Sequence, residues 1–450
     1  MNAPARTAPV DELRSLLRLA APIAFTQAGY ALMGLVDTAV VGRLGAAPLG
    51  AVGVANGLFF ALAVVGLGTM LGLDPLFAQA VGARDEERAR ELIWQGLWLS
   101  GLVTLALALP IAALPLVLAP AGIPEEIARD GRMFLWMRLP GLWPMLAFAA
   151  LRSYLQASHR LQALVIATLL ANVANFALDV ALVFGRFGFP ALGAPGSGLA
   201  TSICSFLQFA VLAAAARPGA RRAPRAADLR KALSVGIPVG LQMGAEVGVF
   251  ALVGVLAGRL GAQALAAHQV AISLASFTFC AAVGVGMAGT VRVGWAIGAR
   301  DTPAARRSGL TAFAGGALVM SIAALSFWLA PGALARMLTD QPEVISIAVP
   351  LLVVCAVFQL SDGIQGVGAG VLRGAGDTRF AFIANLLGHY AVGLPVAVLL
   401  GIKLGQGVIG LWWGLCAGLT AVAISLFTRF VRISSREIVP LEAHPAPQPP

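Results

Sequence analysis

Charged side chains are scarce in this 450-residue chain, with Asp, Glu, Lys and Arg making up only 12% of the residues. A soluble globular domain carries about 25% charged and about 45–50% apolar residues, whereas 59% of this chain is apolar. So large an apolar excess cannot be covered by a polar surface and must face lipid. The scarcity of charge therefore excludes a soluble globular protein and predicts an integral membrane protein surrounded by a lipid bilayer.

Cysteine is also scarce, and each of the four cysteines lies alone in a different apolar run (Cys204, Cys280, Cys355 and Cys416). Without a CxxC pair or a Cys/His cluster, the sequence predicts neither a zinc site nor a disulfide framework, and we expect no cofactor. The net charge of +10 comes from basic residues spread between apolar runs. Because they form no single basic patch, we expect no nucleic-acid partner.

Long apolar segments occur twelve times, each long enough to span about 30 Å of hydrocarbon at about 1.5 Å per residue. The first of them is too long for the apolar region of a cleavable signal peptide. We therefore expect an all-α fold of twelve transmembrane helices. Their expected extents are 16–41, 50–78, 92–118, 133–155, 162–185, 195–216, 233–257, 263–291, 308–331, 344–370, 380–402 and 407–428.

The basic residues between these segments indicate an orientation, because cytoplasmic loops carry an excess of Lys and Arg. With the N-terminus inside, 22 basic residues fall in cytoplasmic segments and eight in outside segments. We therefore expect both termini in the cytoplasm of a multi-pass protein of the plasma membrane, here the bacterial inner membrane.

The chain repeats itself at an offset of 216 residues. Three features recur: Pro22 at Pro238, the tetrapeptide Gly-Arg-Leu-Gly of 42–45 at 258–261, and Gly-Ala-Arg-Asp of 82–85 at 298–301. At an offset of 217, Ala-Thr-Leu-Leu of 167–170 resembles Ala-Asn-Leu-Leu of 384–387. Six spans per repeat is an even number, so the two halves share one orientation in the membrane.

This duplication predicts two six-helix lobes. We expect an N-terminal lobe at 1–216, a cytoplasmic linker at 217–231, a C-terminal lobe at 232–432 and a disordered cytoplasmic tail at 433–450. The tail ends in a proline-rich run that cannot build a packed core. Because both lobes lie in one chain, we expect a monomer.

Four carboxylates lie inside expected spans (Asp37, Asp179, Glu246 and Asp362). Each is a functional candidate, because a charge at mid-bilayer costs at least about 2.5–3.5 kcal/mol. Asp37 and Asp179 should converge in depth with Thr201, and Asn175 lies one turn before Asp179 on the same helix face. These groups could bind Na⁺ through oxygen, or hold a proton between two like-charged acids.

The C-terminal half carries its acids at other positions. An offset of 216 places Val253 opposite Asp37 and Pro395 opposite Asp179. Glu246 and Asp362 arise instead nearer the middle of the membrane, and we treat them as a second possible site for Na⁺ or H⁺. The halves therefore share a scaffold but are predicted to do different work.

Polar and aromatic residues on the acid-bearing faces are predicted to line a substrate cavity (Gln27, Tyr30, Gln242, Phe358 and Gln359). Three other residues are given structural roles. Asp74 lies close to an inner helix end, and His268 and His389 are predicted to be hydrogen-bonding groups of the helix core rather than ligands.

Several runs together resemble the multidrug and toxic compound extrusion (MATE) family, over roughly residues 15–430. They are Val36-Asp37-Thr38 through Gly42-Arg43-Leu44-Gly45, Phe184-Gly185 through Gly198-Leu199-Ala200-Thr201, Ala266-Ala267-His268-Gln269-Val270-Ala271, Arg292-Val293-Gly294 through Gly298-Ala299, and Asp362-Gly363-Ile364-Gln365 through Leu372-Arg373-Gly374 with Asp377-Thr378. Each motif is short, but their order and spacing follow the family.

The resemblance implies cation-coupled efflux of amphipathic, cationic organic compounds by alternating access of two lobes. It implies that Asp37, Asn175, Asp179 and Thr201 form the cation or proton site of the N-terminal lobe. In the NorM-like branch, Glu246 and Asp362 would be the acids of a C-terminal cation site. Position 358 departs from some sodium-coupled members, which carry Tyr where this chain has Phe.

Two other functions compete with drug export. A flippase for lipid-linked or polysaccharide precursors shares this superfamily architecture but would carry a cationic cavity for pyrophosphate, whereas the buried charges here are acidic. A membrane-embedded enzyme such as a prenyltransferase would need paired aspartate motifs for Mg²⁺-diphosphate or a His/Glu metal cluster. Neither motif is present in the sequence, so we expect a transporter and not an enzyme.

Overall fold

The computed structural model describes residues 9–118, 120 and 123–442, and every regular element within them is helical. Twelve helices of this described part are long and apolar enough to cross a membrane, which confirms the predicted fold class. The fourth of these spans is composite, because Pro140 lies in a short 3₁₀ turn between two α-helices. The elements are α1 (Pro9–Gly42), α2 (Ala46–Met70), α3 (Leu73–Gly82), α4 (Glu86–Val117), α5 (Glu125–Arg138), η1 (Leu139–Gly141), α6 (Leu142–Ala157), α7 (Gln162–Phe184), α8 (Ala194–Ala216), α9 (Ala226–Arg259), α10 (Ala262–Gly298), α11 (Thr302–Leu329), α12 (Pro331–Arg336), α13 (Pro342–Gly374), α14 (Thr378–Leu386), η2 (Leu387–Gly393), α15 (Leu394–Val398), η3 (Leu399–Lys403) and α16 (Gly407–Ile433).

The repeated motifs form the same local structures in both halves. Gly45 precedes α2 with a φ of 118°, and Gly261 precedes α10 with a φ of 117°, a conformation that glycine adopts without strain. Asp85 and Asp301 cap α4 and α11, each accepting a hydrogen bond from the backbone N–H three residues later, at 2.9 and 2.8 Å. The repeated sequence motifs therefore form the same helix N-termini in both halves.

The chain forms two compact units that do not coincide with the two sequence halves. Unit 1 contains the chain up to Gln27, residues 78–84 and the chain from Ala245 onward, and unit 2 contains residues 28–77 and 85–244. Each half thus contributes the first part of its first long helix, α1 or α9, to the unit built mainly by the other half. The predicted lobe boundaries at 216 and 232 describe the duplication and stay a prediction.

Small residues allow this exchange of helix segments. In unit 2, a Cβ atom on Gly68 of α2 would lie 2.6 Å from the Cα atom of Gly240 of α9. In unit 1, a Cβ atom on Gly284 of α10 would lie 2.7 Å from the Cβ atom of Ala24 of α1. The two contacts are related by the 216-residue offset, and small residues let helix backbones approach this closely in membranes.

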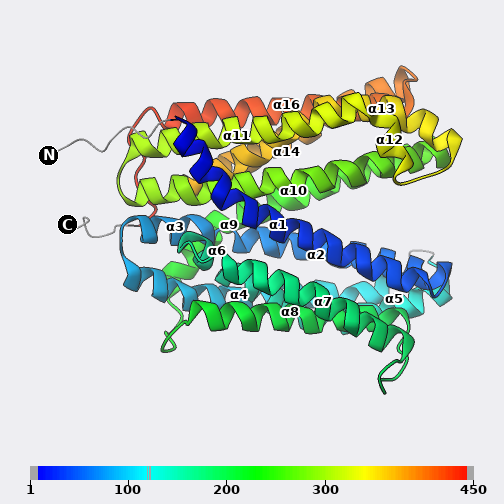
Figure 1. The fold of residues 1–450 in the computed structure, drawn as a ribbon, viewed down its shortest axis with the longest axis horizontal. Helices are drawn as coiled ribbons and strands as arrows, with labels where there is room; N and C mark the ends of the chain where they lie inside the picture. The colour runs from blue at the N-terminus through cyan, green and yellow to red at the C-terminus, as the bar shows by residue number, and fades with distance from the viewer. Residues whose placement is uncertain (1–8, 119, 121–122, 443–450) are drawn as a thin grey trace. The chain divides into compact units, whose positions relative to one another are not determined.

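Within each unit the long helices lie side by side (Figure 1). In unit 1, α13 packs against α10, α11 and α16, and the segments η2, α15 and η3 pack along α16. In unit 2, α8 packs against α5, α6 and α7, while α2 packs against α4 and α5. Each unit therefore has its own helix bundle in which a site can be placed.

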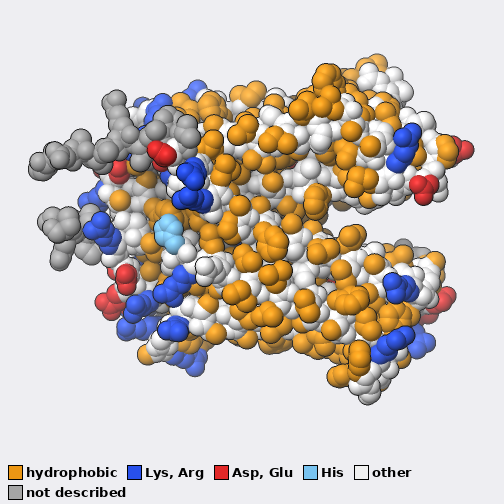
Figure 2. Space-filling view, viewed as in Figure 1, with side chains coloured by type: hydrophobic (Ala, Val, Ile, Leu, Met, Phe, Trp, Pro, Cys, Tyr) orange, Lys and Arg blue, Asp and Glu red, His pale blue; other side chains and the backbone are white. Residues whose placement is uncertain are grey.

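Hydrophobic side chains cover the sides of the helices in each unit, whereas Lys, Arg, Asp and Glu gather at the helix ends (Figure 2). Exposed large apolar residues such as Leu105, Leu109 and Val173 lie in the middle of long helices. Contiguous apolar surface of this kind is typical of helices that face lipid.

Hydrogen bonds hold both the linker and the last described residues of the chain against helices. Trp94 and Trp98 of α4 donate hydrogen bonds from their indole N–H groups to the carbonyls of Pro218 and Arg222, at 3.1 and 2.9 Å. In unit 1, the backbone N–H of Leu441 donates to the side-chain oxygen of Gln79 at 2.7 Å. The remaining part of the predicted tail, 443–450, lies outside the described residues.

Candidate functional site

Close packing of α1, α7 and α8 in unit 2 brings the acids of the N-terminal half together. A Cβ atom on Gly29 of α1 would lie 2.2 Å from the methyl group of Thr168 on α7, so only glycine permits this approach. One turn further along α1, Met33 forms a buried cluster with Ala171 of α7 and Cys204 of α8. These contacts fix how the three helices align along their lengths. The polar residues of the site lie next to them on the same helices.

The four residues predicted for a cation site in the N-terminal half, here called the N-site, all lie in unit 2 (Asp37, Asn175, Asp179 and Thr201). The Thr201 hydroxyl donates to Oδ2 of Asp37 at 3.2 Å, and the Asp179 carboxyl lies close to that of Asp37. Asn175 lies one turn before Asp179 on α7, and both side chains are 0% exposed. The structure therefore brings the two acids and the hydroxyl together.

Most polar atoms of the N-site have no hydrogen-bond partner in the described chain. They include Oδ1 of Asp37, both carboxyl oxygens of Asp179 and both amide atoms of Asn175. Leaving a buried polar group unpartnered costs about 1–3 kcal/mol. Two facing acids with so few donors can be satisfied by a proton held between them or by a small cation bound through oxygen.

Glu246 of α9 lies in unit 1, where two amides hold its carboxylate. Gln365 of α13 donates to Oε1 of Glu246 at 2.5 Å, and Asn385 of α14 donates to the same oxygen. The hydroxyl of Tyr390 donates to the backbone carbonyl of Ala245 at 3.0 Å. Three hydrogen bonds, donated from α13, α14 and η2, therefore hold this turn of α9 in place.

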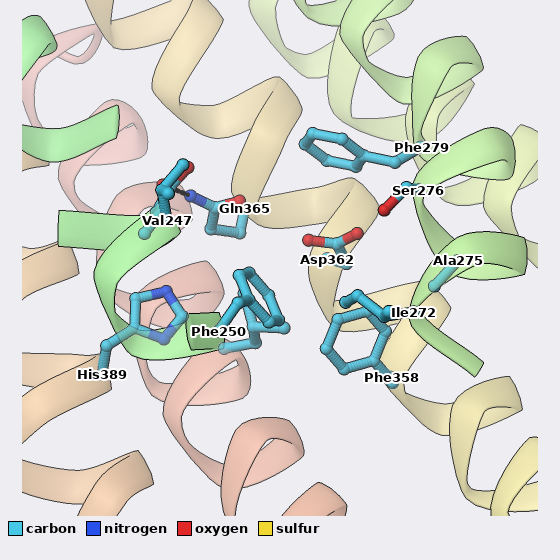
Figure 3. A pocket seen from close by; sticks show the side chains of 12 residues that line it. Val247, Phe250, Ile272, Ala275, Ser276, Phe279, Phe358, Asp362, Gln365 and His389 are labelled. Carbon is cyan, nitrogen blue, oxygen red and sulfur yellow. Dashed lines mark hydrogen bonds between the residues drawn. The ribbon is translucent and has the colours of Figure 1, made fainter. Parts of the chain in front are cut away.

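Glu246 and Asp362, here called the C-site, line one cavity of about 210 Å³ within unit 1 (Figure 3). Asp362 lies on α13 and is 7% exposed. Much of the remaining wall is apolar, with rings from Phe250, Phe279 and Phe358. A carboxylate beside aromatic rings is suited to an organic cation, which interacts with both.

Position 358 contributes only an aromatic ring to this cavity. Phe358 is 1% exposed, and its ring centroid lies 6.1 Å from that of Phe250 and 5.0 Å from that of Trp412. The hydroxyl that a tyrosine would bring one turn before Asp362 is therefore replaced by apolar packing.

The five residues predicted to line a substrate cavity are distributed over both units. Phe358 lines the unit 1 cavity. Gln359 is buried, donates to a threonine hydroxyl of α10 at 2.7 Å and is not among the described residues that line the cavity. Gln27 belongs to unit 1, Tyr30 and Gln242 belong to unit 2, and none of these three is among the described residues that line this cavity. Their role in substrate binding stays a prediction.

Three polar residues around the C-site are given no role in it by the sequence-based prediction (Gln365, Asn385 and His389). Gln365 follows Asp362 by three residues on the same helix face, a spacing that could have pointed to it. Asn385 belongs to the repeat, but no local pattern in the sequence indicates that it contacts Glu246. Of the two histidines expected to form core hydrogen bonds, His268 accepts one from Trp412 at 3.1 Å, whereas neither ring nitrogen of His389 has a partner among the residues that the structure describes.

Across residues 9–118, 120 and 123–442, no group of three or more His, Cys, Asp or Glu residues is arranged to hold a metal ion. The carboxyl, amide and hydroxyl oxygens of the N-site and the C-site are the groups suited to a small hard cation.

Comparison with known proteins adds the family. The family model MatE matches residues 22–181 and 238–399, and the two matches begin 216 residues apart, which confirms the duplication. The probable multidrug resistance protein NorM of Bradyrhizobium diazoefficiens is 35% identical over 444 residues, covering 95% of each chain. The multidrug resistance protein MdtK of Proteus mirabilis is 32% identical over 455 residues, covering 96% of this chain and 99% of that protein.

A solved structure shares the fold. The MATE transporter VcmN of Vibrio cholerae, in its bent form, aligns with a TM-score of 0.86 and 20% identity, covering 96% of this chain and 98% of that chain. At this identity the likeness concerns the fold alone. With a family model matching twice and relatives above 30% identity along nearly the whole length, the chain belongs to the MATE family, in its NorM-like branch, and is a multi-pass membrane transporter rather than an enzyme.

Proposed function

We propose that the chain exports amphipathic organic cations across the plasma membrane in exchange for H⁺ or Na⁺. The relatives named as multidrug resistance proteins support drugs and similar compounds as the cargo. One observation carries the coupling. Asp37 and Asp179 face each other in the N-site, and three of their four carboxyl oxygens have no hydrogen-bond partner in the described chain.

The coupling ion acts by neutralising this acid pair. An ion that enters from outside and binds the N-site removes the repulsion between Asp37 and Asp179, and so favours the conformation that releases cargo outward. Loss of the ion to the cytoplasm restores the repulsion and the inward-facing conformation. Each charge that crosses 100 mV supplies about 2.3 kcal/mol, which is enough for modest uphill export.

The C-site, which the sequence predicts to be a second site for Na⁺ or H⁺, is proposed here to attract the positive charge of the cargo as well. The described residues that line its cavity include Glu246 and Asp362 but no Lys or Arg. This sign of charge supports cationic cargo over the pyrophosphate of a lipid-linked precursor. Phe250, Phe279 and Phe358 offer the apolar contacts that an amphipathic molecule needs.

Both termini are proposed to lie in the cytoplasm. In unit 2, the start of α4 and the linker, two segments assigned to the cytoplasm from their basic residues, lie together. Arg88 pairs with Asp228 at 2.7 Å and Arg225 with Glu91 at 2.7 Å. This convergence supports the orientation expected from the excess of basic residues.

Purified protein in liposomes tests the proposal. Ethidium movement is measured under an imposed pH gradient, under an imposed Na⁺ gradient and without any gradient. We expect gradient-driven transport with one of the two ions, and that gradient names the coupling ion. Equal ethidium movement with and without both gradients would contradict cation-coupled export.

A further inference from the structure

One stretch of the C-terminal half departs from the helix geometry of its counterpart. Residues 387–393 form a π-helical turn, in which the backbone N–H of Leu394 donates to the carbonyl of His389, five residues earlier. The equivalent residues of the N-terminal half, 170–176, lie in the regular helix α7. A π turn changes the direction of the side chains it carries and is frequent at functional sites.

Glycines hold this π turn against α16. A Cβ atom on Gly388 would lie 2.3 Å from a methyl group of Val422, and one on Gly393 would lie 3.2 Å from the carbonyl oxygen of Gly414. The turn is therefore fixed by packing, and so is the direction of His389, which follows Gly388 directly.

His389 is directed into the C-site cavity. Its side chain is 0% exposed to solvent, lines the cavity and has its ring centroid 6.4 Å from that of Phe250. In Figure 3, His389 and Asp362 lie on opposite sides of the Phe250 ring. Neither ring nitrogen of His389 has a hydrogen-bond partner in the described chain, although a neutral imidazole offers one donor and one acceptor.

The size of the cavity limits what can occupy it. An apolar cavity of about 150 Å³ holds one benzene molecule, so the volume of about 210 Å³ here suits one aromatic ring with a small substituent. Such a ring would contact Phe250 and Phe358, and a polar substituent on it would reach the imidazole.

We propose that His389 determines which organic cations this cavity accepts, by hydrogen bonding to a polar substituent on an aromatic ring of the cargo. The inference rests on the proposed function, because it assumes that organic cations are carried. The preferred class is an aromatic cation with an N–H or O–H group on the ring. Cations without such a group gain nothing from the imidazole.

The test compares two one-ring cations in binding to the purified full-length protein. 3-Hydroxyphenyltrimethylammonium carries a hydroxyl group on its ring, and phenyltrimethylammonium is the same cation without it. We expect His389→Phe to lower the affinity for the hydroxylated cation about tenfold relative to phenyltrimethylammonium, as loss of one hydrogen bond in a buried site does. His389→Gln, which keeps a donor and an acceptor, should keep most of the preference for the hydroxylated cation.

His268→Gln is the matched control, because His268 is a buried histidine with a partner outside the lining of the cavity. It should leave the ratio of the two affinities unchanged. An equal loss for both cations in His389→Phe, or a His389→Gln variant no better than His389→Phe, would overturn the proposal. Wild-type protein that binds neither cation would instead overturn the proposed function. Wild-type binding with a ratio insensitive to position 389 would overturn only the role of His389.

Discussion

The N-site and the C-site lie in helix bundles related by the sequence repeat. The carboxylates of the two sites differ in the hydrogen-bond donors that surround them. In the N-site, Asp37 and Asp179 face each other, and among the described residues the Thr201 hydroxyl is the one donor to them. In the C-site, Glu246 already accepts hydrogen bonds from Gln365 and Asn385. The acids of the first site have few donors among the described residues, whereas in the second site one oxygen of Glu246 is already held by two amides.

The contrast arises because duplication preserved the scaffold and not the acids. Asp85 and Asp301 cap equivalent helices with nearly the same geometry. At the position equivalent to Asp37, however, Val253 is fully buried in the apolar core of unit 1. The difference favours a division of labour, with ion exchange at the N-site and recognition of cargo at the C-site.

The largest effect is expected from neutralising the N-site. Asp37→Asn or Asp179→Asn keeps the shape of the side chain but removes the charge that binds the ion. Gradient-driven ethidium export in liposomes should fall at least about 100-fold, equivalent to about 2.8 kcal/mol.

Asp74→Asn is the control for burying an altered acid. Asp74 is buried in unit 2 and accepts a hydrogen bond from Ser153 at 2.5 Å, outside the N-site. This variant should keep gradient-driven export even if less protein is recovered. Gradient-driven export by the Asp37→Asn variant at the wild-type rate would show that coupling does not depend on the N-site.

A smaller and different effect is expected at the C-site. Glu246→Gln and Asp362→Asn should weaken the binding of a one-ring cation such as phenyltrimethylammonium about tenfold, since an electrostatic contact with the carboxylate is lost, while the response to the gradient persists. Apparent affinity and maximal rate are measured separately in liposomes. A C-site variant that loses all gradient dependence would end the proposed division of labour.

Helix contacts that the two halves share should respond alike. Gly240→Ala places a methyl group 2.3 Å from the carbonyl oxygen of Val65, and Gly284→Ala places one 2.7 Å from the Cβ atom of Ala24. Each should destabilise the purified protein by about 1–3 kcal/mol, the usual effect of overpacking. Thermal unfolding in detergent measures this.

Gly57→Ala serves as the comparison for these two variants, because nothing lies within 4 Å of a Cβ atom at that position of α2. It should unfold at or above the wild-type temperature. A loss of stability at Gly57 as large as at Gly240 would mean that the close contact is not the cause.

The smallest effect is expected from the repeated helix caps. Asp85→Ala and Asp301→Ala each remove one side-chain acceptor from a helix start, and each should cost about 1 kcal/mol. The thermal shifts of the two variants should agree with each other. Markedly unequal shifts would show that the two scaffolds have diverged more than their geometry indicates.

Much of the fold could be predicted because it depends on local patterns. Apolar runs of membrane-spanning length, the 216-residue repeat and the Asp caps are all readable from neighbouring residues. The convergence of Asp37, Asp179 and Thr201 was also predictable, since depth along a helix follows from residue counting.

Two features depend on packing between distant segments and could not be read in this way. The exchange of the first parts of α1 and α9 between units depends on backbone contacts such as Gly68 with Gly240. The π turn depends on how Gly388 meets α16. His389 was therefore expected to be a paired core group, like His268.

The exchange of α1 and α9 bears on whether the duplicated gene can be taken apart again. A cut in the linker at 217–225 would leave an N-terminal fragment that carries the part of α1 belonging to unit 1, and a C-terminal fragment that carries the part of α9 belonging to unit 2. Neither fragment would contain every segment of one compact unit. The two pieces would have to be made together and complement each other, because each half of the repeat needs a helix segment of the other to complete a bundle.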